Sequence, residues 1–331
     1  MSELRLFPLG FPWETSDPFL FCVHHLDRYP KGNANMGPEA TLAGRNIGND
    51  FEGKDGWSMY HGQNVPGFPA HPHCGFETVT IVTRGYCDHS DSLGAAARFG
   101  EGDAQWITTG SGLQHSEMFP LLKKDKENTL ELFQIWLNLP RKSKFTDPHF
   151  SMYWKEQIPI WESNGVSVVL IAGNLNGVQS LAPPPNSWAA EAENDVHIGL
   201  INMSANSQFT LPKAHSGSLR RLYLFDGDQV KIGNKLLPSS SGAAISEDAV
   251  TLQSGSGAAR LLWLQGKPIQ EPVARYGPFV MNESEEIQKA IDQFRLTQFG
   301  GWPWRHQDPV HESDSGRFAV FPDGRKITPG N

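Results

Sequence analysis

Residues 71–78 read His71-Pro72-His73-Cys74-Gly75-Phe76-Glu77-Thr78, and residues 110–117 read Gly110-Ser111-Gly112-Leu113-Gln114-His115-Ser116-Glu117. Each stretch carries two good metal ligands separated by one residue. Residues two apart on a β-strand point to the same face, about 6.5 Å apart along the strand. His71 and His73 can therefore aim at one point, and His115 and Glu117 can approach it from a second strand. Three imidazoles and one carboxylate predict a site for a divalent transition metal.

The chain between and after these pairs has the pattern of short β-strands. Residues 78–83 read Thr-Val-Thr-Ile-Val-Thr, and glycine turns separate this segment from the expected strands 104–109 and 113–119. A longer apolar strand is expected at 129–139. Residues 74–114, which lie between the two ligand pairs, leave room for several hairpins. Short strands punctuated by glycine predict an all-β sandwich or barrel. We expect these hairpins to bring the two pairs face to face.

The second half repeats the short-strand pattern, in segments 166–171, 197–203, 218–225, 229–232, 243–245 and 259–264. This repetition predicts two β domains in tandem, at residues 1–140 and 141–300, followed by a tail at 301–331. His197 and His215 stand alone in the second domain. We therefore expect one metal, in the first domain.

One helix is expected near the C-terminus. Asn282 would be its N-cap and Glu285 would reach back to the cap. Ile287, Ile291 and Phe294 recur at helical spacing and would face the core. Residues 301–331 have few periodic apolar residues, and we expect a tail laid over the surface and held there by Trp302 and Trp304.

Composition limits the classes of partner. The chain has 331 residues and a formal net charge of -8, which disfavours nucleic acid or an anionic membrane as the main partner. Its three cysteines form no paired framework, and reduced thiols indicate a cytoplasmic protein. The first residues lack a signal peptide's pattern, and no apolar run is long enough to span a membrane.

Four stretches together resemble the pirin family of the cupin superfamily: HPHCGFETVT (71–80), HSDS (89–92), GDAQWITTGSGLQHSE (102–117) and RYGPFVMN (275–282). The resemblance implies a bicupin, with two cupin-type β-barrels and a metal only in the first. It implies Fe(II) held by His71, His73, His115 and Glu117, with Mn, Co, Ni, Cu or Zn as alternatives. Cys74 departs from the family pattern, in which many members carry Arg.

Glu77 is the alternative carboxylate. In cupins, a Glu three or four residues after His-x-His often binds the metal, and Glu77 fits that spacing. On a straight strand, however, it lies about 13 Å beyond His73 and reaches the metal only if the strand bends at Gly75. We therefore prefer Glu117 as the ligand. We expect Glu77 to contact the ligands rather than the metal itself.

The resemblance implies two functions. Some pirins resemble quercetin 2,3-dioxygenases, which open a flavonol with O2; Glu117, or Glu77, would then be the general base for a small aromatic or enol substrate. Others are iron-dependent, redox-sensing regulators that bind a protein partner, a transcription factor or metabolic enzyme, without catalysis. Of these two functions, we expect the enzymatic one, a dioxygenase. Most of the aromatics near the ligands should be core, and one or two of them should line an apolar pocket over the metal: Phe68, Phe76, Trp106, Phe119 and Phe133.

Overall fold

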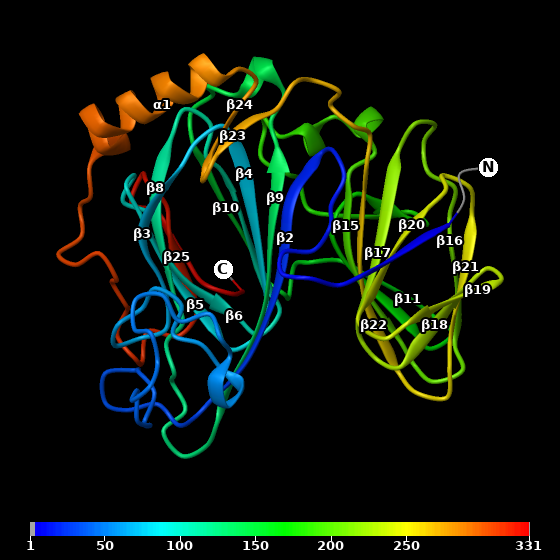
Figure 1. Ribbon diagram of the computed structural model, residues 1–331, viewed down its shortest axis with the longest axis horizontal. Helices are drawn as coiled ribbons and strands as arrows, with labels where there is room; N and C mark the ends of the chain where they lie inside the picture. The colour runs from blue at the N-terminus through cyan, green and yellow to red at the C-terminus, as the bar shows by residue number, and fades with distance from the viewer. Residues whose placement is uncertain (1–3, 331) are drawn as a thin grey trace. The chain divides into compact units, whose positions relative to one another are not determined.

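A computed structural model describes residues 4–330 and consists mostly of β-strands with one α-helix near the C-terminus (Figure 1). Contacts group the chain into two compact units. We call residues 24–134, 141–156 and 271–330 the first barrel, and residues 4–23, 135–140 and 157–270 the second barrel. The grouping is not sequential, which differs from the expected ranges 1–140, 141–300 and 301–331. Those ranges stay a prediction about the two cupin domains.

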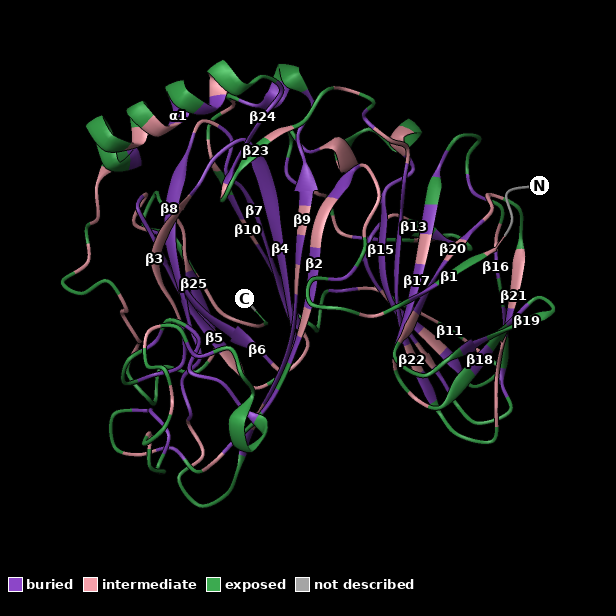
Figure 2. Cartoon of the chain, viewed as in Figure 1, coloured by how far each residue is buried: buried purple, intermediate pink, exposed green. Residues whose placement is uncertain are grey.

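Two sheets form the first barrel. The six-stranded sheet has, in spatial order, β26 (Lys326–Ile327), β25 (Phe318–Val320), β6 (Ala96–Gly100), β5 (Tyr86–Asp91), β8 (Leu113–Met118) and β3 (Gly67–His73). The five-stranded sheet has β10 (His149–Tyr153), β7 (Asp103–Thr108), β4 (Phe76–Arg84), β9 (Asn128–Asn138) and β2 (Phe19–Tyr29). β7 pairs antiparallel with β10 and β4 in one sheet, and in the other sheet the neighbours from β25 to β3 pair antiparallel along the order given. β4, β7 and β8 are buried along most of their length, as Figure 2 shows.

The second barrel also has two sheets. Its seven-stranded sheet has β1 (Arg5–Pro8), β20 (Ser241–Ile245), β17 (Leu219–Asp226), β22 (Ala259–Gly266), β15 (His197–Met203), β12 (Val166–Ala172) and β11 (Ile160–Ser163). Its four-stranded sheet has β16 (Gln208–Leu211), β21 (Val250–Ser254), β18 (Gln229–Ile232) and β19 (Lys235–Pro238). A small hairpin joins β13 (Asn174–Leu175) to β14 (Val178–Gln179). A continuous apolar cluster fills this barrel, as two facing sheets with alternating apolar residues require.

The expected strands of both halves are present, and further strands form where the sequence shows no continuous apolar run. Residues 19–29 form one long strand, although only residues 19–23 show a continuous apolar run. The polar connector 142–164 contains β10 and β11. Most residues of β5 are polar, yet all of the strand except Tyr86 is buried, because other segments cover both of its faces.

The helix α1 (Ser284–Thr297) begins one residue later than expected. Its N-cap is Glu283 rather than Asn282, and Glu286 rather than Glu285 reaches back: its carboxylate accepts the backbone N–H groups of residues 282 and 283. The expected apolar face is confirmed in a cluster that also contains Cys74, Phe279, Met281 and Phe299. The hairpin of β23 (Ala274–Tyr276) and β24 (Phe279–Met281) lies beside it.

The tail contains two strands that belong to a sheet of the first barrel. β25 pairs with β6 and β26 pairs with β25, so the tail extends the six-stranded sheet. Trp304 donates its indole N–H to the Asp91 carbonyl (2.8 Å), whereas Trp302 donates only within the tail, to His306. Within residues 4–330, no helix is long and apolar enough to cross a membrane.

Candidate metal centre

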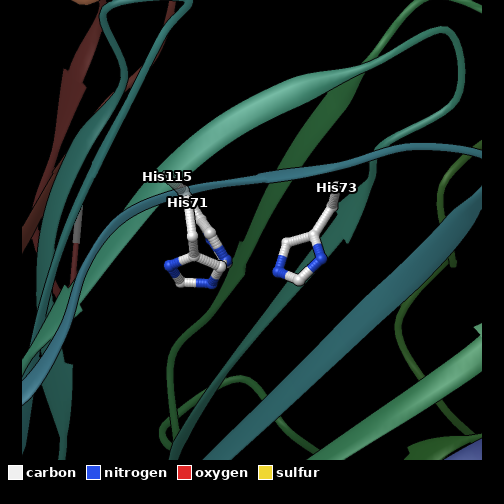
Figure 3. Close-up of side chains that lie close together, drawn as sticks. All are labelled: His71, His73 and His115. Carbon is white, nitrogen blue, oxygen red and sulfur yellow. The ribbon is translucent and has the colours of Figure 1, made fainter. Parts of the chain in front are cut away.

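The two ligand pairs lie on neighbouring antiparallel strands. β3 and β8 pair with His71 opposite His115, so both side chains project from the same face of the sheet. Figure 3 shows the rings of His71, His73 and His115 gathered at one place. One ring nitrogen from each lies within 4.8 Å of the others, and the Nε2 atoms of His71 and His115 are 3.1 Å apart. The expected convergence of the three imidazoles is therefore present in the structure.

A local irregularity in β3 precedes His71 and helps to set the direction of its side chain. The register between β3 and β8 shifts between Phe68 and His71, which places two residues of β3 outside the ladder. The Pro69 carbonyl lies 2.8 Å from Nδ1 of His71 and accepts its proton. This bond fixes the tautomer, because it leaves the Nε2 lone pair directed at His115.

Burial keeps the three imidazoles neutral. Desolvation lowers the pKa of His71 to about 4, and it lowers the pKa values of His73 and His115 well below the ordinary value. His115 is fully buried, and its Nδ1 has no hydrogen-bond partner. Neutral imidazoles offer the lone pairs that a transition metal binds. The residues present therefore fit a divalent cation.

Glu117 supplies a carboxylate at the edge of the histidine cluster. Its Oε2 lies 3.8 Å from Nε2 of His115, and only 5% of the residue is exposed. Thr80 Oγ1 lies 3.0 Å from Glu117 Oε1, and Gln134 donates to Oε2 at 3.3 Å. Burial raises the pKa of Glu117, and this is partly offset by His89 and by the Thr80 hydrogen bond. Its role as fourth ligand stays a prediction.

Glu77 lies on the other face of β4. Phe76 contacts the His73 ring (centroids 5.2 Å apart), and Thr80 reaches Glu117, so even-numbered residues of β4 face the histidines. Alternation along the strand turns Glu77 away. The Thr108 hydroxyl donates to the Glu77 carboxylate at 2.7 Å on that face. Glu77 therefore lies away from the histidines in this structure, and its catalytic or supporting role stays a prediction.

His89 is a neighbour of the site to which the sequence assigned no role. It pairs with Glu117 across β5 and β8, and its ring centroid lies 5.5 Å from that of His115. Its Nε2 is 3.1 Å from the Asp91 carboxylate. The sequence contained a signal for this neighbour: His89 and Asp91 are separated by one residue, as the members of each ligand pair are.

Most of the surrounding aromatics are core, as expected. Phe76, Trp106, Phe119 and Phe133 are buried, with at most 2% exposure. Phe68 is half-buried, and its ring centroid lies 6.3 Å from that of His71. Of the five aromatic residues, Phe68 is therefore the one whose ring is exposed enough to contact a ligand near the histidines.

The tail passes over the opposite face of the same sheet. Asp88 alternates with His89 along β5 and so points away from the histidines, where it forms a fully buried pair with Arg98 (2.7 Å). The Arg98 guanidinium also donates to the carbonyls of His311 and Glu312 in the tail. A further backbone bond joins Ala70 to the Gln307 carbonyl, next to the first ligand.

A histidine cluster inside the first of two β-barrels defines a two-domain cupin. Two family patterns match the chain, described as Pirin (residues 46–137) and Pirin C-terminal cupin domain (residues 200–300). The chain belongs to the pirin family, as the sequence resemblance implied.

Named relatives agree with this assignment. A Pseudomonas aeruginosa protein named "Putative quercetin 2,3-dioxygenase PA3240" is 35% identical over 236 residues, which cover 70% of this chain and 79% of the relative. Pirin-1 of Arabidopsis thaliana is 34% identical, with 71% and 78% covered. A crystal structure of quercetin 2,3-dioxygenase from Acinetobacter baumannii superposes with a TM-score of 0.67 at 26% identity, covering 86% of each chain.

Proposed function

We propose that this pirin-family bicupin is an Fe(II)-dependent dioxygenase that acts on a flavonol or a related small enol. The observation that carries the proposal is the convergence of three neutral imidazoles and one buried carboxylate inside the first barrel. Relatives and a structural neighbour named as quercetin 2,3-dioxygenases support the reaction class. When bound, the metal supplies Lewis-acid and redox chemistry for the enol and O2.

The residues of this chain would divide the work as follows. His71, His73 and His115 hold the metal through neutral ring nitrogens. Glu117 accepts the proton of the substrate hydroxyl, and its raised pKa brings it closer to that task than an exposed carboxylate. Thr80 and Gln134 hold the Glu117 carboxylate in place. Phe68 offers the half-buried ring against which a flavonol ring can stack.

The test is a single-turnover reaction. Protein loaded with Fe(II) under anaerobic conditions is mixed with quercetin, and O2 is then admitted. We expect the flavonol absorption band to bleach, and we expect His115→Ala to abolish bleaching. Glu77→Gln is the matched carboxylate control and should bleach as the unmodified protein does.

Absence of bleaching while iron stays bound at full stoichiometry would overturn the flavonol proposal. The regulatory hypothesis would then remain, and it predicts that oxidation of bound iron changes affinity for a protein partner. A reaction with a different enol under the same conditions would keep the dioxygenase class and change the substrate.

A further inference from the structure

A chain of ring contacts connects the histidine cluster to the surface of the first barrel through Tyr60. The Tyr60 ring stacks on that of Phe68, with centroids 5.1 Å apart and planes 26° apart. The Phe68 ring in turn contacts His71, with centroids 6.3 Å apart. Tyr60 also meets the ring of Phe51 at 5.4 Å, and 42% of Phe51 is exposed. The contacts are therefore continuous from a predicted metal ligand, through a buried tyrosine, to solvent.

Two buried polar side chains hold the Tyr60 hydroxyl, and only 5% of the residue is exposed. The hydroxyl donates to Oδ2 of Asp27 at 2.7 Å. Nδ1 of His25 lies 2.8 Å from the same oxygen. A phenol has one hydroxyl proton, and Asp27 accepts it, so His25 is the donor in the second bond. The phenol thus has a proton acceptor on one side and a hydrogen-bond donor on the other.

The electrostatics of this cluster favour transfer of the phenolic proton to Asp27. Burial raises the pKa of Asp27 to about 6, although the hydrogen bonds from Tyr60 and Ser58 lower it. Asp27 is therefore ionised at neutral pH, while burial favours its protonated form. Burial lowers the pKa of His25 to about 3, so its ring stays neutral. A proton that moves to Asp27 removes a buried negative charge and leaves the bond from His25 in place.

The backbone holds Tyr60 in an unusual conformation. Its φ is +56°, in the left-handed region that bulky side chains rarely adopt. Two backbone hydrogen bonds to Asp50, each 2.9 Å, fix the residue there. Conformations of this kind persist only where the surrounding structure determines them strongly, and they gather at functional sites. The strain keeps the Tyr60 ring on Phe68 and its hydroxyl on Asp27.

We propose that Tyr60 is a redox-active tyrosine that gives an electron to the metal centre when hydrogen peroxide oxidises bound iron. Reduction of peroxide to two water molecules takes two electrons and two protons. One electron comes from Fe(II), which becomes Fe(III), and the other from Tyr60, which becomes a neutral radical. The phenolic proton moves to Asp27, and solvent supplies both protons for the two waters. The ligand histidines are thereby spared oxidation. The inference rests on the proposed iron centre but not on the flavonol reaction.

Electron paramagnetic resonance tests the proposal. Protein loaded anaerobically with Fe(II) is mixed with a stoichiometric amount of hydrogen peroxide and frozen. We expect an organic-radical signal whose hyperfine splitting narrows when the chain carries ring-deuterated tyrosine. Tyr60→Phe keeps the ring on Phe68 and should reduce the signal by roughly tenfold or more, because it removes the transferable proton. Tyr29→Phe is the matched control and should keep the signal, since the buried Tyr29 hydroxyl donates to the Ser58 carbonyl, which is no proton acceptor.

Two further measurements separate a redox role from a structural one. Asp27→Asn should also reduce the radical yield by roughly tenfold, because an amide oxygen does not take up the phenolic proton. In Tyr60→Phe, peptide mass spectrometry should find more oxidation of His71, His73 and His115 after peroxide treatment than in the unmodified protein. Iron stoichiometry, measured in each variant, checks that the centre is intact.

An equally strong signal in Tyr60→Phe would overturn the inference, as would the absence of any organic radical while iron stays bound at full stoichiometry. Bleaching of quercetin is measured in the same preparation. Bleaching without a radical would overturn only the role of Tyr60, whereas a radical without bleaching would overturn only the flavonol reaction. A preparation that retains no iron after loading would overturn both.

Discussion

The hydroxyl of Thr80 lies 3.0 Å from Oε1 of Glu117. Thr80 belongs to the five-stranded sheet and Glu117 to the six-stranded sheet, so the contact crosses the interior of the first barrel. Glu117 on one sheet thus accepts a hydrogen bond from a side chain of the facing sheet. Orienting contacts of this kind commonly change metal affinity as much as some ligands do.

Thr80→Val should weaken metal binding by about tenfold to a hundredfold, because it removes the hydroxyl that orients Glu117. Thr78→Val is the matched control: Thr78 is also buried, two residues away on the same face of β4, and its hydroxyl has no hydrogen-bond partner. Competition with a chromophoric chelator measures both affinities. Equal affinities in the two variants would show that Thr80 does not support the site.

The two candidate carboxylates can be separated by one pair of variants. Glu117→Gln should lower metal affinity by at least about tenfold, since it removes the negative charge beside the histidines. Glu77→Gln should leave affinity within about twofold, because Glu77 lies on the opposite face and an amide oxygen can still accept from Thr108. The same chelator competition applies. A larger loss in Glu77→Gln than in Glu117→Gln would reverse the assignment.

The stability of the metal-free protein should fall in mild acid. The pKa of His115 is well below its ordinary value in the folded chain, while in the unfolded chain it is near 6.5. Below pH 6.5 the unfolded chain therefore binds a proton at His115 that the folded chain does not bind. The contribution of neutral His115 to the free energy of unfolding is thus fully present above pH 6.5 and falls as the pH is lowered below it. Between pH 7.5 and 5 the loss should be about 2 kcal/mol for this residue.

Urea unfolding of the metal-free protein at the two pH values measures this loss. His115→Gln should reduce the difference by the same amount, since glutamine does not titrate. A pH dependence that is identical in the variant would mean that His115 is not kept neutral by the fold.

The tail should contribute to the stability of the first barrel through Arg98. Arg98→Met removes the guanidinium from a fully buried pair with Asp88 and removes its hydrogen bonds to two tail carbonyls, those of His311 and Glu312. We expect a loss of about 3–5 kcal/mol in the free energy of unfolding. Arg84→Met is the control: its exposed side chain lies 3.8 Å from Glu131, so its loss should stay below about 1 kcal/mol. A loss in Arg98→Met as small as the control's would show that the tail contributes little.

The sequence predicted the histidine cluster because strand geometry has a fixed period of two. That period places His71 and His73 on one face of their strand, and it places His115 and Glu117 on one face of theirs. The order of the intervening strands is not needed for this step. The same rule placed Glu77 with His73 only on the assumption of a continuous strand. The turn at Gly75 changes the parity, and glycine alone does not reveal which turn forms.

Contacts between residues far apart in the sequence were not predictable. Arg98 looks like an ordinary charged residue of a short strand, and its partners, residues 311 and 312, lie more than two hundred residues later. Buried polar neighbours in the second barrel were also missed, because only the pairing of β15, β22 and β17 brings His197, Gln265 and Arg220 side by side. The sequence showed His197 standing alone.

Elemental analysis of the purified protein tests the central claim most directly, that one divalent cation is held by His71, His73, His115 and Glu117. We predict one transition-metal ion per chain, iron when the protein is prepared anaerobically with Fe(II), and its loss in His115→Ala. The variant His215→Ala, altered in the second barrel, should retain the ion. A metal-free protein after loading, or an ion retained at full stoichiometry in His115→Ala, would contradict the account.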